Sequence, residues 1–149
     1  MLEGCLFCVK LQSEDDAAHI VYRGRLCYVI LNRFPYNNGH LMVVPCAHVP
    51  SLEDLDAETL AELMALTQLS LRVLREAYNP QGFNVGLNIG QVAGAGVADH
   101  VHLHVVPRWG GDTNYMTIVC QTRVIPEWLD EMYARLRPLF ERMSREEDE

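Results

Sequence analysis

Short apolar runs separated by turn residues occupy the first third of the chain. Residues 21–22 and 26–31 are rich in β-branched and aromatic side chains around a glycine turn, which predicts two strands joined as a hairpin. A third apolar run, residues 41–44, follows an Asn-Asn-Gly turn and ends at Pro45. We therefore expect an antiparallel meander, with His40 at the start of a buried strand.

The pattern changes after the meander, because apolar positions then recur every three or four residues. This spacing predicts one long helix that begins near Asp56, a suitable N-cap, and stops at residues 79–80, where Asn-Pro follows. A second apolar stripe predicts a C-terminal helix from Pro126, which Pro138 should kink or end. The charged residues 144–149 are expected to fray into a flexible tail.

Two further apolar segments, residues 83–89 and 101–106, flank a glycine-rich stretch at 90–96 and predict two strands with a connecting loop. The chain has 149 residues, of which 49% are hydrophobic, and it shows no internal repeat or low-complexity linker. The pattern thus predicts a single α+β domain over residues 1–149. Its mainly antiparallel sheet should have five or six strands.

Charge and the distribution of cysteines narrow the function. Twelve Lys and Arg against twenty Asp and Glu give a formal charge of −8, which argues against binding DNA or RNA through many phosphate contacts. A small anionic substrate is still possible where backbone amides, imidazoles or a metal create a local site. The chain shows neither a basic and apolar leader nor a membrane-length apolar run, and its five scattered cysteines do not suggest a disulfide framework. We expect a cytoplasmic protein without membrane contact.

Three histidines stand at alternate positions, His100, His102 and His104, with apolar residues between them. On a strand, this spacing puts all three imidazoles on one face and leaves the other face for the core. A lone buried histidine is usually structural, but a row of three is costly to bury without hydrogen-bond partners. The row therefore indicates a functional site rather than ordinary core packing.

This pattern resembles the histidine-triad (HIT) family, whose signature is H-x-H-x-H followed by two apolar positions, here 105–106. The resemblance covers residues 5–116 and includes an N-terminal segment at 5–8, the strand at 39–45 and the loop at 88–96. It implies a HIT-like fold. It also implies a nucleotide hydrolase or transferase that attacks an α-phosphate through a covalent nucleotidyl-histidine intermediate.

The resemblance assigns different roles to the histidines. His102 is the expected nucleophile, and a backbone carbonyl near the triad should accept from its other ring nitrogen. His104 is expected to contact phosphate oxygens or the leaving group, and His40 to support the catalytic geometry. His19 matches no family position, so we expect it at the surface.

The same resemblance suggests how a nucleoside is held. Leu6, Phe7 and Ile30 lie where relatives form an apolar pocket for a purine base, although ordinary core packing would explain each of them. Asn32, a polar residue that ends an apolar strand, matches a ribose-contacting position. The alternative for Asn32 is a turn-capping role.

A phosphate-binding loop is expected around Asn88, with amides of Gly94, Ala95 and Gly96 stabilising charge on the α-phosphate. Glycines suit such close approach because they carry no Cβ. The loop departs from the family in one respect. Where relatives have Gln-Ser or Gln-Thr, this chain has Gly96-Val97, so a side-chain hydroxyl that contacts phosphate is missing.

Cys5 and Cys8 have a C-x-x-C spacing that one tetrahedral zinc ion can accept. The family resemblance adds His48 and His100 as the remaining ligands and implies a closed, structural zinc site that pins the N-terminal segment to the catalytic strand. The alternative is a pair of small apolar cysteines, with His48 capping the following loop and His100 supporting its neighbours.

Residues 107–116 resemble a bacterial and archaeal group that includes diadenosine tetraphosphate phosphorylases, so dinucleoside polyphosphates are the expected substrates. Water or phosphate as the final acceptor stays open, as do nucleoside phosphoramidates as substrates. Arg33 and Arg108 are candidates for binding distal phosphates. The galactose-1-phosphate uridylyltransferase branch fits less well, because its triad ends in glutamine where this chain has His104.

Two expectations concern the protein beyond its chemistry. The family usually dimerises by joining two sheets, so the resemblance implies a homodimer or higher homo-oligomer. A different class of function is a non-catalytic module that binds a nucleotide as a sensor. The intact nucleophile His102 argues against that class.

Overall fold

The computed structural model describes residues 4–33, 37–111 and 126–148. Cys120, Glu149 and the part of the phosphorylase-like segment at 112–116 lie outside these ranges. In chain order the elements are α1 (Leu6–Leu11), α2 (Asp15–Ala18), β1 (Ile20–Arg23), β2 (Cys27–Leu31), β3 (Leu41–Pro45), the 3₁₀ turn η1 (Leu52–Asp54), α3 (Ala57–Tyr78), β4 (Gly82–Leu87), the 3₁₀ turn η2 (Gln91–Ala93), β5 (Leu103–Arg108) and α5 (Pro126–Glu147).

The described strands form one five-stranded sheet in the order β1-β2-β3-β5-β4, and every neighbouring pair is antiparallel. The hairpin β1-β2 and the third strand β3 form the predicted meander. Strand β5 then enters between β3 and β4, where His104 lies opposite Met42 on one side and Gly86 on the other. The α+β class with an antiparallel sheet is confirmed, and the last triad histidine lies inside the sheet.

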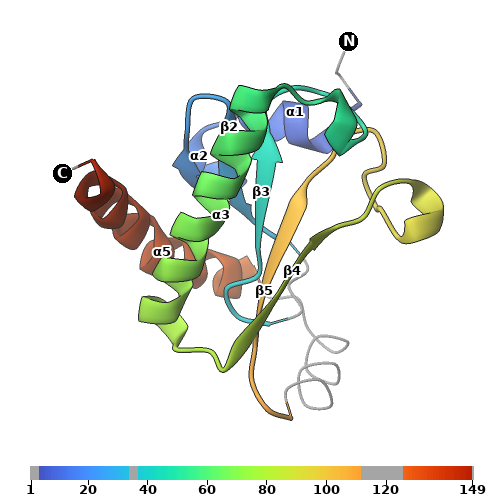
Figure 1. Cartoon of the computed structure of the whole chain (residues 1–149). Helices are drawn as coiled ribbons and strands as arrows, with labels where there is room; N and C mark the ends of the chain where they lie inside the picture. The colour runs from blue at the N-terminus through green and yellow to red at the C-terminus, as the bar shows by residue number, and fades with distance from the viewer. Residues whose placement is uncertain (1–3, 34–36, 112–125, 149) are drawn as a thin grey trace.

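Helix α3 covers one face of the sheet (Figure 1). The Asp56 carboxylate caps it by accepting from the Thr59 amide at 2.8 Å, and the helix ends where Asn79 adopts a left-handed φ of 48°. Its buried side chains, among them Leu63 and Leu74, pack on one alternate set of strand residues, including Val43. The long helix predicted from periodicity is therefore confirmed with nearly the same bounds.

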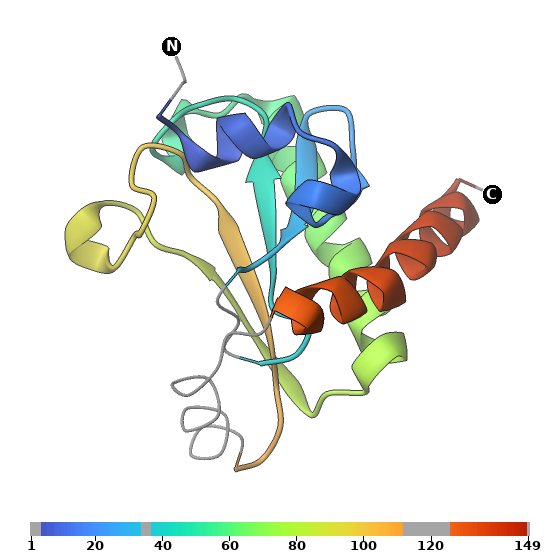
Figure 2. The same ribbon diagram turned by 180° about the vertical axis from the view of Figure 1, so that it is seen from behind.

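Helix α1 packs on the opposite face (Figure 2). Here Phe7 and Cys8 pack on the strand side chains that point away from α3, which include Tyr28, Ile30 and Met42. The Tyr28 hydroxyl donates to the Phe7 carbonyl at 2.8 Å, so it fixes the first turn of α1 to the sheet. Because the sheet is covered on both faces, β2 and β3 are buried at every position.

Helix α5 corrects two expectations about the C-terminus. It continues past Pro138 instead of ending there, because Leu136 and Phe140 on either side are fully buried in the core that α5 shares with α3 and β1. Residues 144–147, for which the charge pattern predicts a frayed tail, are helical, and Glu147 pairs with Arg72 of α3. No helix in the described ranges is long and apolar enough to cross a membrane.

The histidine strand is shorter than its alternation predicts. Strand β5 begins at Leu103, so His100 and His102 precede it. There the Val101 amide donates to the Val49 carbonyl, in the segment that follows β3, at 2.8 Å. The side chains still alternate between the two faces in this segment, because Val101 and Leu103, between the histidines, are buried in the core under α3.

Candidate active site and metal centre

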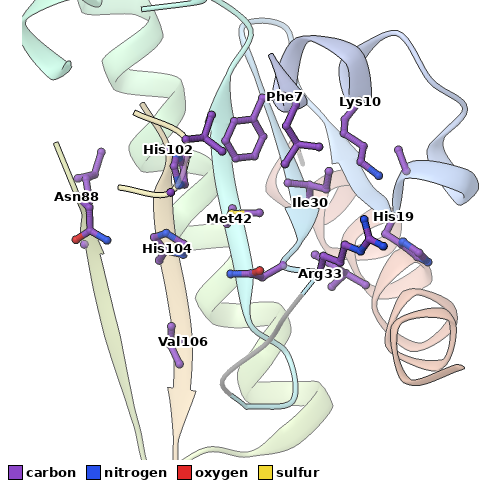
Figure 3. A pocket seen from close by; sticks show the side chains of 18 of the residues that line it. Phe7, Lys10, His19, Ile30, Arg33, Met42, Asn88, His102, His104 and Val106 are labelled. Carbon is purple, nitrogen blue, oxygen red and sulfur yellow. The ribbon is translucent and has the colours of Figure 1, made fainter. Parts of the chain in front are cut away.

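A cavity of about 1140 Å³ opens beside β5, between α1 and the loop that follows β4 (Figure 3). Its volume exceeds the range of about 300–1,000 Å³ that is usual for small-molecule sites, so a mononucleotide would leave part of it free. Predicted site residues that line it are Leu6, Phe7, Ile30, Asn32, Asn88, Gly94, Gly96, His102 and His104. Segments from both halves of the chain thus converge on one site.

His102 lines this cavity with one ring nitrogen already engaged. Its Nδ1 lies 2.9 Å from the backbone oxygen of His100, and since a carbonyl can only accept, Nδ1 carries the proton. The neutral ring therefore keeps its lone pair on Nε2. The Phe7 ring lies against the His102 ring with 4.7 Å between centroids, which limits rotation of the imidazole. The sequence resemblance predicted a carbonyl acceptor without naming it, and the structure supplies the carbonyl of His100.

His104, His40 and Asn32 form a continuous chain of polar contacts across β5, β3 and the end of β2. His40 Nε2 lies 3.1 Å from the Asn32 amide nitrogen and 3.0 Å from His104 Nδ1. His104 therefore has Nε2 left to face the cavity. His40 thus contacts the triad through His104, and Asn32 contacts His40 in addition to lining the cavity.

Burial keeps these imidazoles neutral. Desolvation lowers the pKa of His102, while the bond to the His100 carbonyl partly opposes it. Desolvation, followed by the charge of His102, lowers the pKa of His104 to about 4. For His40, desolvation and then the charge of His104 lower the pKa to about 3. Every buried side-chain nitrogen and oxygen in the described ranges has a hydrogen-bond partner, which resolves the cost of burying the row.

The glycine-rich loop differs from its predicted arrangement. The Gly94 amide donates to the Gln91 carbonyl at 3.0 Å, and the Ala95 amide donates to the Gly90 carbonyl at 3.3 Å. Both donors thus close the loop on itself, and Ala95 is buried apart from the cavity-lining residues. Gly94 and Gly96 do line the cavity, so the Gly96 amide is the better placed of the three for a phosphate.

Alternating strand faces explain a site residue that sequence reasoning missed. Met42 lines the cavity beside Phe7 and Ile30 and is only 7% exposed. It stands two positions after His40, and period-two alternation places both side chains on the same side of β3. The two-residue spacing from His40 could therefore have predicted Met42 as a site residue. Ile30 and Phe7 are likewise buried, whereas Leu6 is 48% exposed at the cavity edge.

His19 corrects another expectation, since it lines the cavity rather than standing alone at the surface. It adopts a left-handed φ of 61° after α2, and its Nε2 lies 2.8 Å from a carboxylate oxygen of Asp130 on α5. Of the two arginines predicted for distal phosphates, Arg33 lines the cavity. Arg108 instead donates to the Asn84 side chain at 2.6 Å.

Four predicted metal ligands meet near the start of α1: Cys5, Cys8, His48 and His100 have their ligand atoms within 4.8 Å of one another. Cys5 precedes the first turn of α1 and Cys8 lies within it, so both sulfurs emerge from the same end of the helix. His48 follows β3, and His100 precedes β5. The cluster therefore joins α1 to the segment that carries the three alternating histidines.

Interatomic distances in the cluster fit a tetrahedral zinc ion. Bonds of about 2.3 Å to sulfur and 2.0–2.1 Å to nitrogen require roughly 3.5 Å between sulfur and nitrogen and roughly 3.3 Å between two nitrogens. His100 Nδ1 lies 3.3 Å from Cys5 Sγ, 3.6 Å from Cys8 Sγ and 3.3 Å from His48 Nδ1. Cys8 Sγ lies 3.4 Å from His48 Nδ1.

Proton placement on His100 supports the same conclusion. Its Nε2 lies 2.7 Å from the Pro45 carbonyl and must donate to it, so the neutral ring presents the lone pair of Nδ1 to the cluster. Without a metal, burial and the neighbouring Cys5 raise the pKa of the Cys8 thiol to about 11. A divalent cation would reverse that shift by stabilising the thiolate. The four side chains can thus hold one zinc ion with no open position.

Comparison with known proteins decides the family, because the HIT domain model matches residues 13–111. The chain belongs to the HIT family. It is 53% identical over 118 residues to the AP-4-A phosphorylase of Mycobacterium tuberculosis, a match that covers 79% of this chain and 60% of that protein. It is also 30% identical over 104 residues to an adenylylsulfatase of Arabidopsis thaliana, with 70% of this chain and 52% of that protein covered. The HIT chain thus spans between half and two thirds of these relatives.

A solved structure extends the likeness to the whole HIT fold. A zinc-bound histidine triad family protein from Mycobacterium smegmatis superposes with a TM-score of 0.76 at 30% identity. The match covers 97% of this chain and 99% of that protein. The HIT-like fold predicted from the triad is therefore confirmed over nearly the full length.

Proposed function

We propose that this HIT protein cleaves dinucleoside polyphosphates by phosphorolysis, with His102 as the nucleophile. The observation that carries the proposal is the bond from His102 Nδ1 to the His100 carbonyl at 2.9 Å. It leaves an unprotonated Nε2 on a ring whose pKa burial has lowered, which is the form needed for attack near pH 7. The 53% identity to an AP-4-A phosphorylase favours phosphate as the acceptor over water.

The reaction proceeds in two displacements. His102 Nε2 attacks the α-phosphorus of diadenosine tetraphosphate, the bond from that phosphorus to the bridging oxygen breaks, and ATP leaves. Inorganic phosphate then attacks the adenylyl group on His102, the phosphorus–nitrogen bond breaks, and ADP leaves with the imidazole restored. The net change is diadenosine tetraphosphate plus phosphate to ADP plus ATP.

Neighbouring residues have supporting roles in this proposal. His104 Nε2 faces the phosphate oxygens or the leaving oxygen, and its contact with His40 holds the ring in place. The Gly96 amide lies on the loop side of the cavity, where charge develops on the α-phosphate. Asn32, Phe7 and Ile30 line the same cavity, which supports contact of Asn32 with the ribose and of the two apolar side chains with the base.

We further propose that Cys5, Cys8, His48 and His100 hold a structural zinc ion. Four protein ligands leave no position for water or substrate, so the metal would contribute rigidity rather than chemistry. It would tie α1, which carries Phe7, to the segment that carries His102. The zinc-bound relative from Mycobacterium smegmatis supports this assignment.

The test uses diadenosine tetraphosphate with and without ³²P-labelled inorganic phosphate, followed by separation of the products. Phosphorolysis predicts ADP plus ATP only when phosphate is present, with the label in the β-phosphate of ADP. Formation of AMP plus ATP at the same rate without phosphate would identify a hydrolase instead. Binding of AMP without turnover of diadenosine tetraphosphate or adenosine phosphoramidate would support a binding module.

A further inference from the structure

Lys10 is the only lysine in the chain, and it lies in the cavity wall. It stands on α1 three positions after Phe7 and four after Leu6, so helical spacing puts the three side chains on the same face. Its side chain is half-buried, and it has no hydrogen bond or ion pair with another residue in the described part of the chain. The aliphatic stem can cover apolar surface while the ammonium group reaches the end of the cavity.

The order of the residues along the cavity indicates which part of a bound nucleotide lies next to the Lys10 ammonium group. In Figure 3, Asn88, His102 and His104 lie on one side and Lys10 lies on the other, with Phe7, Met42 and Ile30 between them. A nucleotide with its α-phosphate at His102 places its base across the apolar middle. When the base is turned so that N7 and the substituent on C6 point away from His102, that edge meets Lys10.

That end of the cavity carries two cationic side chains, Lys10 and Arg33. Arg33 and His19 line the cavity on the same side as Lys10. Asp130 of α5 contacts His19 there, and its side chain is 74% exposed. An ammonium group offers three donors and no acceptor, so it is satisfied by an edge that carries acceptors.

Purines differ at this edge. A 6-oxopurine such as guanine presents two acceptors, N7 and O6, whereas adenine presents N7 beside an amino group that is itself a donor. A cation facing the adenine amino group meets a donor and gains one contact at most. The same cation can bridge O6 and N7 of guanine.

We propose that Lys10 makes the cavity prefer 6-oxopurine nucleotides over adenine nucleotides. This inference rests on the proposed function, since it takes the phosphate at His102 as the fixed end of the ligand. It ranks the substrates within that class, because dinucleoside polyphosphates that carry a guanine or hypoxanthine base should bind more tightly than diadenosine tetraphosphate does. Lys10 is then a specificity residue that contacts the base and takes no part in the displacement at phosphorus.

The test measures the affinity of GMP, IMP and AMP by calorimetry for the wild-type protein and for Lys10→Met, which keeps the stem and removes the charge. We expect GMP and IMP to bind the wild type roughly five- to tenfold more tightly than AMP. In Lys10→Met the three affinities should agree within about twofold. Arg145→Met, on the exposed end of α5, removes the same charge away from the cavity and should keep the wild-type preference.

IMP separates the carbonyl at position 6 from the amino group at position 2 of guanine, so GMP binding tightly while IMP binds like AMP would overturn the inference. Equal or tighter binding of AMP by the wild type would also overturn it, as would a GMP preference that persists in Lys10→Met. Because the chain has one lysine, reductive methylation with ¹³C-formaldehyde labels Lys10 and the terminal amine while keeping the charge. GMP should shift the Lys10 methyl signal more than AMP does.

Failure of this inference can be told from failure of the proposed function. Phosphate-dependent turnover of diadenosine tetraphosphate without any GMP preference would overturn the role of Lys10 alone. Absence of both turnover and mononucleotide binding would overturn the proposed function as well. Normal thermal unfolding of Lys10→Met would show that its altered affinities do not arise from a damaged fold.

Discussion

His40 couples the stability of the fold to pH. Its side chain is 1% exposed, and desolvation, with the charge of His104 as the second cause, lowers its pKa to about 3. In the unfolded chain the pKa of histidine is about 6.5. Between these two values the unfolded state binds a proton that the native state does not, so the free energy of unfolding must fall as the pH falls below about 6.5.

The difference between the native and unfolded pKa of His40 sets how much the free energy of unfolding changes with pH. Each pH unit below 6.5 costs about 1.4 kcal/mol while the native imidazole stays neutral, so acidification from pH 7 to pH 5 should remove about 2 kcal/mol through His40 alone. The substitution His40→Gln keeps a polar side chain and removes the titration. Urea unfolding of both proteins at pH 7 and pH 5 measures the four free energies that are needed.

We expect the wild type to lose about 2 kcal/mol more between pH 7 and pH 5 than His40→Gln loses. Protonation of the other histidines and of the cysteine cluster occurs in both proteins and cancels in this comparison. Equal losses in the two proteins would refute the reasoning, because His40 would then be protonated in the native state or accessible to water.

Three further predictions concern the nucleophile, the metal cluster and the hairpin. His102→Ala should abolish turnover of diadenosine tetraphosphate and leave AMP affinity within roughly tenfold, or about 1.4 kcal/mol; substantial residual turnover would remove His102 from its role. Zinc at one hundred times its dissociation constant should stabilise the wild type by about 2.7 kcal/mol, which raises the melting temperature by roughly 5–10 °C over chelated protein. Cys8→Ser should lose this rise and the half-buried Cys46→Ser should keep it, so an equal rise in both would contradict the ligand set. The Glu62 carboxylate accepts from the backbone amides of Leu26 and Cys27 at 2.6 Å each. Glu62→Gln should therefore cost about 1–3 kcal/mol in urea unfolding, and a loss below about 0.5 kcal/mol would show that water replaces the carboxylate.

Local patterns were sufficient for most of the elements. The Asp56 cap and the three- and four-residue spacing predict α3, and the glycine turn between two β-branched runs predicts the hairpin β1-β2. These signals work because each element is stabilised by contacts within a few residues. They failed at Pro138, where burial of Leu136 and Phe140 by other elements keeps the helix continuous.

The residues of the candidate site were likewise predicted only in part. The alternation of His100, His102 and His104 carries the family resemblance, and the C-x-x-C spacing at Cys5 and Cys8 indicates half of a metal site. Neither signal places His19 or Lys10 in the cavity, because both residues reach it through the packing of α1 and α2 against the sheet. A surface histidine and a cavity histidine look the same in sequence.

The sequence alone determined most of the secondary structure, the alternating positions of the three histidines and the family resemblance, all of which depend on residues near one another in the chain. Tertiary structure decided which distant residues meet. It brings His100 to within 3.3 Å of Cys5 and His40 to within 3.0 Å of His104. The order β1-β2-β3-β5-β4 and the burial of the sheet on both faces make these contacts. That order depends on the apolar surface buried between elements far apart in the chain, which no local pattern records.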